Sequence, residues 1–104
     1  MKFIDINQRL NYMYDSKDYM SMYKEALHLK SDYSTAKRLE VTRQMMTKIK
    51  NGSPLSKDLA YKIAKAIKHD PIEIIATTMA EREKNLDIKA VWIKLAKEKG
   101  NDGD

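Results

Sequence analysis

The chain has no cysteine among its 104 residues and only three glycines and two prolines. Without cysteine it can form neither a disulfide framework nor a thiolate metal site. The scarcity of glycine and proline, together with abundant Lys, Ala, Met, Leu and Ile, favours a fold built entirely of helices. No apolar run approaches the length of a signal peptide or a membrane span, so the sequence predicts a cytoplasmic protein that does not enter a membrane.

Motifs that carry catalysis or bind cofactors are also missing. The two histidines, His28 and His69, have no partners at metal-ligand spacing, and neither a glycine-rich phosphate loop nor a paired-acid motif occurs. Glu73, Glu81 and Glu83 are interpreted as helix-capping and surface groups. We therefore expect a protein that is not an enzyme and that has no catalytic residue, metal site or cofactor.

Positive charge is concentrated in one part of the chain. The whole sequence has 20 Lys and Arg against 15 Asp and Glu, a formal net charge of +5. Between residues 37 and 68, nine cationic residues are opposed only by Glu40 and Asp58. Such a basic segment fits a polyanionic partner. The plainer interpretation is a solvated, lysine-rich helix surface with no specific partner.

Residues 34–52 have the pattern of two short helices joined by a tight turn, S-T-A-K-R-L-E-V-T-R-Q-M-M-T-K-I-K-N-G. Small and apolar residues would hold these helices together: Ala36, Leu39, Val41, Met46 and Ile49. Thr42 is predicted to cap the second helix, and Asn51-Gly52 is predicted to end it, with Gly52 in a left-handed conformation.

The outer face of the predicted second helix is polar and contains no acid. Its side chains are Arg43, Gln44, Thr47 and Lys48. In a DNA major groove, Arg or Lys matches guanine and Gln matches adenine. This face therefore predicts a DNA-reading helix, although any surface helix also carries polar groups.

Apolar residues at helical spacing predict further helices at about 15–30, 57–68, 71–84 and 87–99. Asp70-Pro71 is a strong start signal, because an acidic cap precedes proline at the first helical position. The expected N-caps are Asp32 or Ser34, Thr42, Ser56, Asp70 and Asp87. The stripe Ile88, Val91, Trp92, Leu95 and Ala96 in the last helix either completes the monomer core or forms a two-fold interface.

The chain is long enough for one domain with a single modest core. We predict an N-terminal extension at 1–16, a DNA-binding domain at 17–84, a C-terminal helix at 85–99 and a disordered tail at 100–104. The extension is interpreted either as a short helix or as an arm that packs on a partner subunit.

Two runs of the sequence resemble the Cro/C1-type (XRE) helix-turn-helix family of phage and bacterial repressors. They are A-K-R-L-E-V-T-R-Q-M-M-T-K-I-K-N-G and D-L-A-Y-K-I-A-K-A-I-K-H-D-P, which follow in the family's order and spacing. The resemblance implies an all-α fold, a compact five-helix lambda-repressor-like helix-turn-helix bundle, here with an N-terminal extension and an extra C-terminal helix. Glu40 and Lys68 stand where the family usually has glycine, and a left-handed backbone there costs a non-glycine residue roughly 1 kcal/mol.

The resemblance also implies roles for individual residues. The base-reading positions of the recognition helix, 42–51, are matched by Thr42, Arg43, Gln44, Thr47 and Lys48. Phosphate-contact positions are matched by Lys50 and Asn51, and the basic segment adds Lys37, Arg38, Lys57 and Lys62 as further phosphate-binding candidates. Candidates for a dimer interface are Ile88, Val91, Trp92 and Leu95.

We therefore expect a sequence-specific DNA-binding transcriptional regulator of the phage or prophage repressor type. It would bind a palindromic operator in double-stranded DNA as a homodimer, with its two recognition helices ~34 Å apart. One alternative is an antitoxin of the same fold, whose N-terminal segment or last helix binds a toxin. Another is a helix-turn-helix adaptor that binds only protein, and a stable co-purifying partner would favour either alternative.

Overall fold

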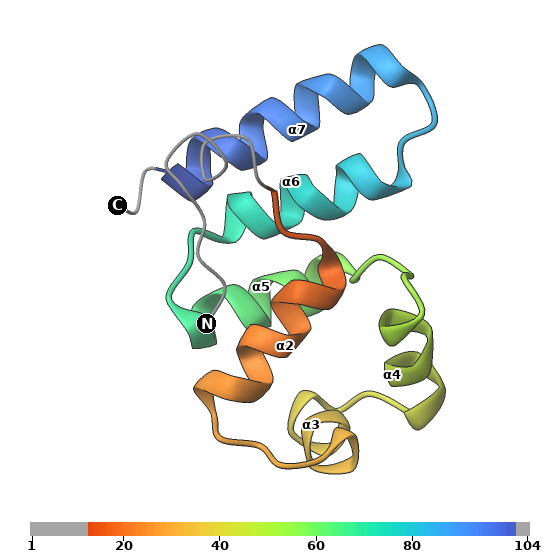
Figure 1. The fold of residues 1–104 in the computed structure, drawn as a ribbon, viewed down its shortest axis with the longest axis vertical. Coiled ribbons are helices and arrows are strands. Elements are labelled where there is room, and N and C mark those ends of the chain that lie inside the picture. The colour runs from red at the N-terminus through yellow and green to blue at the C-terminus, as the bar shows by residue number, and fades with distance from the viewer. Residues whose placement is uncertain (1–12, 102–104) are drawn as a thin grey trace, which may run out of the picture.

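Residues 13–101 are described by a computed structural model of the protein, and they form six helices and no strand (Figure 1). The helices are α2 (Ser16–Ala26), α3 (Asp32–Leu39), α4 (Arg43–Lys50), α5 (Lys57–Ile67), α6 (Pro71–Arg82) and α7 (Leu86–Asn101). The all-helical class predicted from composition is thus confirmed for this range. None of these helices is long and apolar enough to cross a membrane. The predictions for residues 1–12 and 102–104 lie outside the described residues.

Three of the expected N-caps are confirmed. The side-chain oxygens of Thr42, Ser56 and Asp70 each accept a hydrogen bond from a backbone N–H in the first turn of α4, α5 and α6. These groups would otherwise be unpaired at a helix start, which explains why local sequence was sufficient to find them.

Two other caps differ from the prediction. Ser31, rather than Asp32 or Ser34, caps α3, and its hydroxyl accepts from the Ser34 N–H at 3.0 Å. Asn85 takes the place of Asp87 before α7, because its side-chain oxygen accepts from the N–H groups of Asp87 and Ile88. Both helices therefore begin earlier than expected.

Several helix ends also differ from the predicted bounds. α2 ends at Ala26 instead of about Lys30, because His28 has a φ of 56°, a left-handed conformation that an α-helix cannot continue. α6 ends at Arg82 rather than about Lys84. α7 continues through Gly100 and Asn101, two residues that were expected in the tail.

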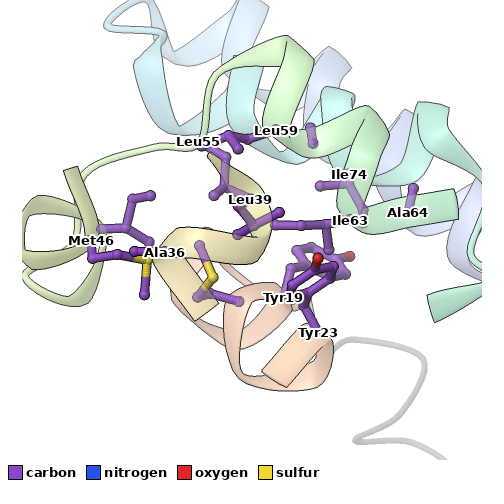
Figure 2. Close-up of a cluster of buried hydrophobic side chains, with 13 residues drawn as sticks. Tyr19, Tyr23, Ala36, Leu39, Met46, Leu55, Leu59, Ile63, Ala64 and Ile74 are labelled. Carbon is purple, nitrogen blue, oxygen red and sulfur yellow. The ribbon is translucent and has the colours of Figure 1, made fainter. Parts of the chain in front are cut away.

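One hydrophobic core joins α2 through α6 (Figure 2). Its buried members are Tyr19, Met20, Tyr23, Ala36, Leu39, Met46, Ile49, Leu55, Leu59, Ala60, Ile63, Ala64 and Ile74. Tyr19, Met20 and Tyr23 of α2 and Met46 of α4 are therefore core residues.

α7 forms an antiparallel hairpin with α6, at the end of the molecule away from α3 and α4 (Figure 1). Ala96 is buried and Trp92 and Leu95 are half-buried, whereas Ile88 and Val91 are 47% and 64% exposed. The predicted apolar stripe is thus divided between the core and the solvent.

A buried carboxylate, which the sequence analysis did not anticipate, connects α2 with α6. Glu73 was interpreted as a capping or surface group, yet it is 5% exposed. Its carboxylate accepts a hydrogen bond from the Tyr19 hydroxyl and lies 3.0 Å from His69 Nδ1. Gly100 of α7 covers it so closely that a Cβ there would lie 3.4 Å from Glu73 Cδ. The end of α7 thus shields this polar cluster.

A second polar contact fixes the start of α2. Ser16 is 1% exposed, and both its N–H and its hydroxyl donate to the Glu81 carboxylate of α6. The same hydroxyl accepts from the Leu55 N–H at 3.0 Å. Glu81 is therefore a half-buried structural partner of α2 and not the surface group that the sequence indicated.

Tyr19→Phe is expected to lower the free energy of unfolding by about 1–3 kcal/mol, because the buried Glu73 carboxylate would lose a donor. Urea unfolding at pH 7 measures the change. Tyr61→Phe is the matched control, since Tyr61 is 52% exposed. Equal stability of the two variants would contradict the structural role of the Tyr19 hydroxyl.

The same variant should change the response to alkaline pH. Burial, followed by the hydrogen bond to Glu73, raises the pKa of Tyr19 above its usual value of 10.0. A raised pKa in the folded state means that the neutral tyrosine stabilises the fold below pH 10, and that this contribution is lost as the pH rises further. Above pH 10, stability should therefore fall less steeply for Tyr19→Phe than for the unmodified chain.

Candidate nucleic-acid interface

A tight turn at residues 40–42 joins α3 to α4. Glu40 ends α3 with φ 61° and ψ 43°, the left-handed conformation predicted for this position, and Lys68 repeats it after α5 with φ 65°. The Val41 N–H then donates to the Ala36 carbonyl at 2.9 Å. Lys62 donates to the Leu39 carbonyl at 3.2 Å. These bonds satisfy carbonyls that the end of α3 leaves unpaired.

Two buried side chains set the rotation of α4. Met46 is 3% exposed and Ile49 is 0% exposed, and both belong to the core. Figure 2 shows Met46 near Ala36 of α3. Because successive helix positions turn by about 100°, burial of these two residues directs the remaining polar residues of α4 outward.

All the predicted base-reading side chains are exposed on this outward surface: Thr42, Arg43, Gln44, Thr47 and Lys48. They form two stripes. Arg43, Thr47 and Lys50 follow one another at spacings of four and three, while Gln44 and Lys48 lie one turn apart on the neighbouring stripe. The helix has no acidic residue in its first turn. Its exposed surface is consequently cationic and rich in hydrogen-bonding groups.

A groove of about 710 Å³ runs between α3 and α4. The predicted contact residues that line it are Lys37, Arg43, Thr47, Lys50 and Asn51. The other predicted contact residues lie outside this lining: Arg38, Thr42, Gln44, Lys48, Lys57 and Lys62. About half of the predicted DNA-contact residues therefore line one groove. Gln44 and Lys48 lie on the neighbouring exposed stripe of α4.

Lys50 already has an acidic partner, which the sequence analysis missed. Its Nζ donates to Asp32 Oδ2 at 2.6 Å, and Lys24 of α2 donates to Oδ1 at 3.0 Å. The hydrogen bond from Lys50, and then that from Lys24, holds the pKa of the Asp32 carboxyl below its usual value. Asp32 therefore keeps a negative charge beside the groove and neutralises part of its positive charge.

Lys62 also has a partner within the chain. Besides its bond to the Leu39 carbonyl, its Nζ lies 3.9 Å from Glu40 Oε1. The Lys62 side chain is 47% exposed, so it remains accessible to solvent while it caps α3. The sequence predicted Lys62 as a phosphate-binding residue, and in the structure it hydrogen-bonds the turn between α3 and α4.

Tyr33 is the second groove residue that the sequence analysis missed. It is 71% exposed, and Lys37 Nζ lies 6.0 Å from the centroid of its ring. The stretch Ser31-Asp32-Tyr33-Ser34 was interpreted as a polar break between helices. Once Ser31 is known to cap α3, both Asp32 and Tyr33 fall in the first turn of that helix, beside α4.

Replacing each left-handed residue by glycine should stabilise the fold. We expect Glu40→Gly and Lys68→Gly each to raise the free energy of unfolding by about 0.5–1 kcal/mol, since glycine adopts positive φ without a Cβ clash. Chemical denaturation measures both variants. Ala90→Gly serves as the opposite control, because this exposed residue within α7 has an ordinary helical backbone and glycine there should destabilise. A loss of stability in Glu40→Gly would contradict the account of the turn.

No group of three or more His, Asp or Glu side chains within residues 13–101 is arranged to hold a metal ion. In comparisons with known proteins, no family model matches the chain, and neither a curated protein nor a solved structure matches it. A function must therefore be inferred from the chain's own residues.

Proposed function

We propose that this chain is a sequence-specific DNA-binding regulator in which α4 enters the major groove. The proposal rests on one observation: one side of the short helix α4 is buried in the core and the other side is exposed to solvent. Met46 and Ile49 fix the helix on the core, and an acid-free surface with Arg43, Gln44 and Lys48 faces outward. A guanidinium, an amide and an ammonium group are the donors and acceptors suited to base edges.

Phosphate contacts surround this helix in the proposed complex. Lys37 and Lys50 line the groove beside α4, and Asn51 ends the helix. Lys17 and Lys24 of α2 line a smaller hollow of about 230 Å³ that also contains Lys50. These cations would hold the DNA backbone and set the register of α4 without reading sequence.

In the proposed interface, the Asp32 carboxylate competes with the DNA phosphates for Lys50. A DNA phosphate that contacts Lys50 must replace the Asp32 carboxylate as its partner. The exchange conserves one charge-assisted bond but leaves Asp32 near the phosphate, which opposes binding. The non-specific attraction of the chain to DNA is therefore reduced. As a result, discrimination between DNA sequences depends more on the base contacts of α4.

The five helices from α2 to α6 are proposed to form a lambda-repressor-like bundle, with α3 and α4 as its helix-turn-helix. The left-handed residues Glu40 and Lys68 and the Asp70-Pro71 helix start support this assignment, because they lie where the resembling family has its turns and its fifth helix. α7 is then an addition to the bundle.

A single α4 reads only a few base pairs, so the regulator is proposed to act as a homodimer on a palindromic operator, as a repressor in the cytoplasm. A toxin or another regulatory protein remains the second candidate partner, as for an antitoxin or an adaptor. The exposed apolar residues Leu86, Ile88 and Val91 of α7 favour some protein contact at that helix.

Two alanine variants separate the base-reading role from the phosphate role. Gln44→Ala should cost about 1–3 kcal/mol on a duplex selected from a random pool, and relax the preference at one base pair. Lys50→Ala should weaken binding to all sequences similarly and reduce the slope of log affinity against log salt by about one. Fluorescence anisotropy on selected and scrambled duplexes measures both effects.

Asp32→Asn is the matched control, because it removes the partner of Lys50 while leaving α4 intact. It should tighten binding to scrambled DNA by roughly two- to fivefold, which corresponds to one exposed ion pair. If Gln44→Ala and Lys50→Ala lost affinity equally on selected and scrambled DNA, the proposed division between the two roles would be wrong. Purification of the native protein in a stable complex that does not bind DNA would favour the antitoxin or adaptor.

A further inference from the structure

The groove between α3 and α4 has an apolar bottom and a polar rim. Ala36 and Met46 line it and are only 7% and 3% exposed, so they lie at its bottom. Val41, in the turn between the two helices, is half-buried and adds a third apolar side chain. The groove volume of about 710 Å³ falls within the range of small-molecule sites, about 300–1,000 Å³. The groove therefore has the size and the apolar surface that a small organic ligand requires.

Two cations lie at the end of the groove next to the turn. Lys37 is in the last turn of α3 and Arg43 is the first residue of α4, so both flank residues 40–42. Both side chains are exposed, and within residues 13–101 neither forms an ion pair. The other end of the groove differs, because Lys50 is already paired with Asp32 there. The groove thus offers two unpaired positive charges at one of its ends.

An exposed aromatic ring forms part of the α3 wall of the groove. Tyr33 is 71% exposed, and its ring centroid lies 6.0 Å from Nζ of Lys37, one helical turn further along α3. The Tyr33 ring contributes little to the core, but a second flat ring can stack on it. Stacking of this kind accepts many ring structures, since every nucleic-acid base has a π-face. The wall is therefore suited to a planar aromatic group.

We propose that this groove binds a small aromatic phosphomonoester, such as a nucleoside monophosphate. Its phosphate lies between Lys37 and Arg43, while its planar ring covers the apolar bottom and stacks on the neighbouring tyrosine. A phosphomonoester carries a charge of about −1.5 to −2 at pH 7, which two cations match, whereas a carboxylate leaves one cation uncompensated. The guanidinium of Arg43 can also bind two phosphate oxygens at once. A neutral ring would leave both cations unused, and inorganic phosphate would leave the apolar bottom exposed to water.

A consequence for regulation rests on the proposed function. Lys37 and Arg43 are also proposed DNA contacts, so a phosphomonoester bound to them occupies part of the surface that the DNA requires. The bound ligand also places negative charge beside α4, which repels the DNA phosphates. Ligand and DNA should therefore exclude each other, and a rise in ligand concentration should release the regulator from its operator. The binding of the ligand itself requires no DNA.

Isothermal titration calorimetry of the full chain without DNA tests the ligand class. Adenosine monophosphate should bind with a dissociation constant between about 10 µM and 1 mM, as expected for a small ligand in an open groove. Adenosine and inorganic phosphate each supply half of the recognised chemistry, and each should bind roughly tenfold more weakly or worse. Phenyl phosphate distinguishes the sources of the ligand. If it binds at least as tightly as adenosine monophosphate, the ligand class is aryl phosphates in general, and otherwise it is nucleotides.

Tyr33→Ala tests the position of the ring. It should raise the dissociation constant of adenosine monophosphate roughly tenfold at every salt concentration, because the lost stacking contact carries no charge. Tyr61→Ala is the matched control, since Tyr61 of α5 is 52% exposed and does not line the groove. Both residues are exposed, so neither variant should unfold the chain.

Lys37→Ala tests the position of the phosphate. It should raise the same dissociation constant roughly tenfold at low salt and make it less dependent on salt, because a charge-assisted bond is lost. Lys94→Ala is the matched control, since Lys94 is also exposed but belongs to α7. The two groove variants thus differ in their salt dependence, which a merely structural disturbance of α3 would not produce.

Any of three results would overturn the proposed ligand site. The first is that neither adenosine monophosphate nor phenyl phosphate binds in the micromolar to low millimolar range. The second is that adenosine or inorganic phosphate binds as tightly as adenosine monophosphate, because one half of the ligand would then have no role. The third is that Tyr33→Ala binds adenosine monophosphate as tightly as Tyr61→Ala does.

Fluorescence anisotropy with a selected duplex tests the regulatory consequence separately. At about ten times the dissociation constant of the ligand, and at constant ionic strength, the apparent dissociation constant of the DNA should rise about elevenfold. Simultaneous binding of ligand and DNA without competition would contradict this consequence. A chain that binds adenosine monophosphate but no DNA would contradict the proposed function and leave the ligand site standing. A chain that binds DNA but neither of the aromatic phosphates would do the reverse.

Discussion

The burial of Met46 and Ile49 is the constraint on which the proposed interface depends. α4 has only eight residues, too few for a stable helix in isolation, so its structure requires packing on the core. The same packing determines which side chains face outward. Loss of either anchor would change the rotation of the helix as well as its stability. Gln44 and Lys48 are therefore positioned by two apolar neighbours and not by contacts of their own.

The part of the molecule away from α4 depends on a different kind of interaction. A carboxylate as buried as that of Glu73 is costly unless its oxygens are satisfied, and here Tyr19 and His69 supply the partners. The cluster joins α2 to α6 and is covered by Gly100 of α7. α7 consequently has a structural side, which shields this cluster, and an outer side centred on Val91. The half-burial of Trp92 and Leu95 agrees with a helix that completes the core and still offers a second surface.

Local patterns predicted much of this arrangement, because caps and helical stripes depend on residues close in sequence. Thr42, Ser56 and Asp70 were found in this way, whereas the left-handed positions Glu40 and Lys68 were implied by the resemblance to a family that usually has glycine there. The missed features join distant residues. Tyr19 and Glu73 are 54 positions apart, and Asp32 and Lys50 are 18 apart, so no local pattern reveals either pair. Glu73 stands three residues after Asp70, where a glutamate often helps to cap a helix, but its side chain is buried in the core.

The most direct measurement of the central claim is a ¹H–¹⁵N NMR titration of the full chain with a short DNA duplex at low and moderate salt. If α4 reads DNA, the largest shift changes should fall on residues 42–51 and on Tyr33 and Lys37 beside the groove. The outer residues of α7 should change little, because they lie at the other end of the molecule. Shift changes confined to α7, or no changes at any salt concentration, would contradict the assignment of α4 as a DNA-reading helix.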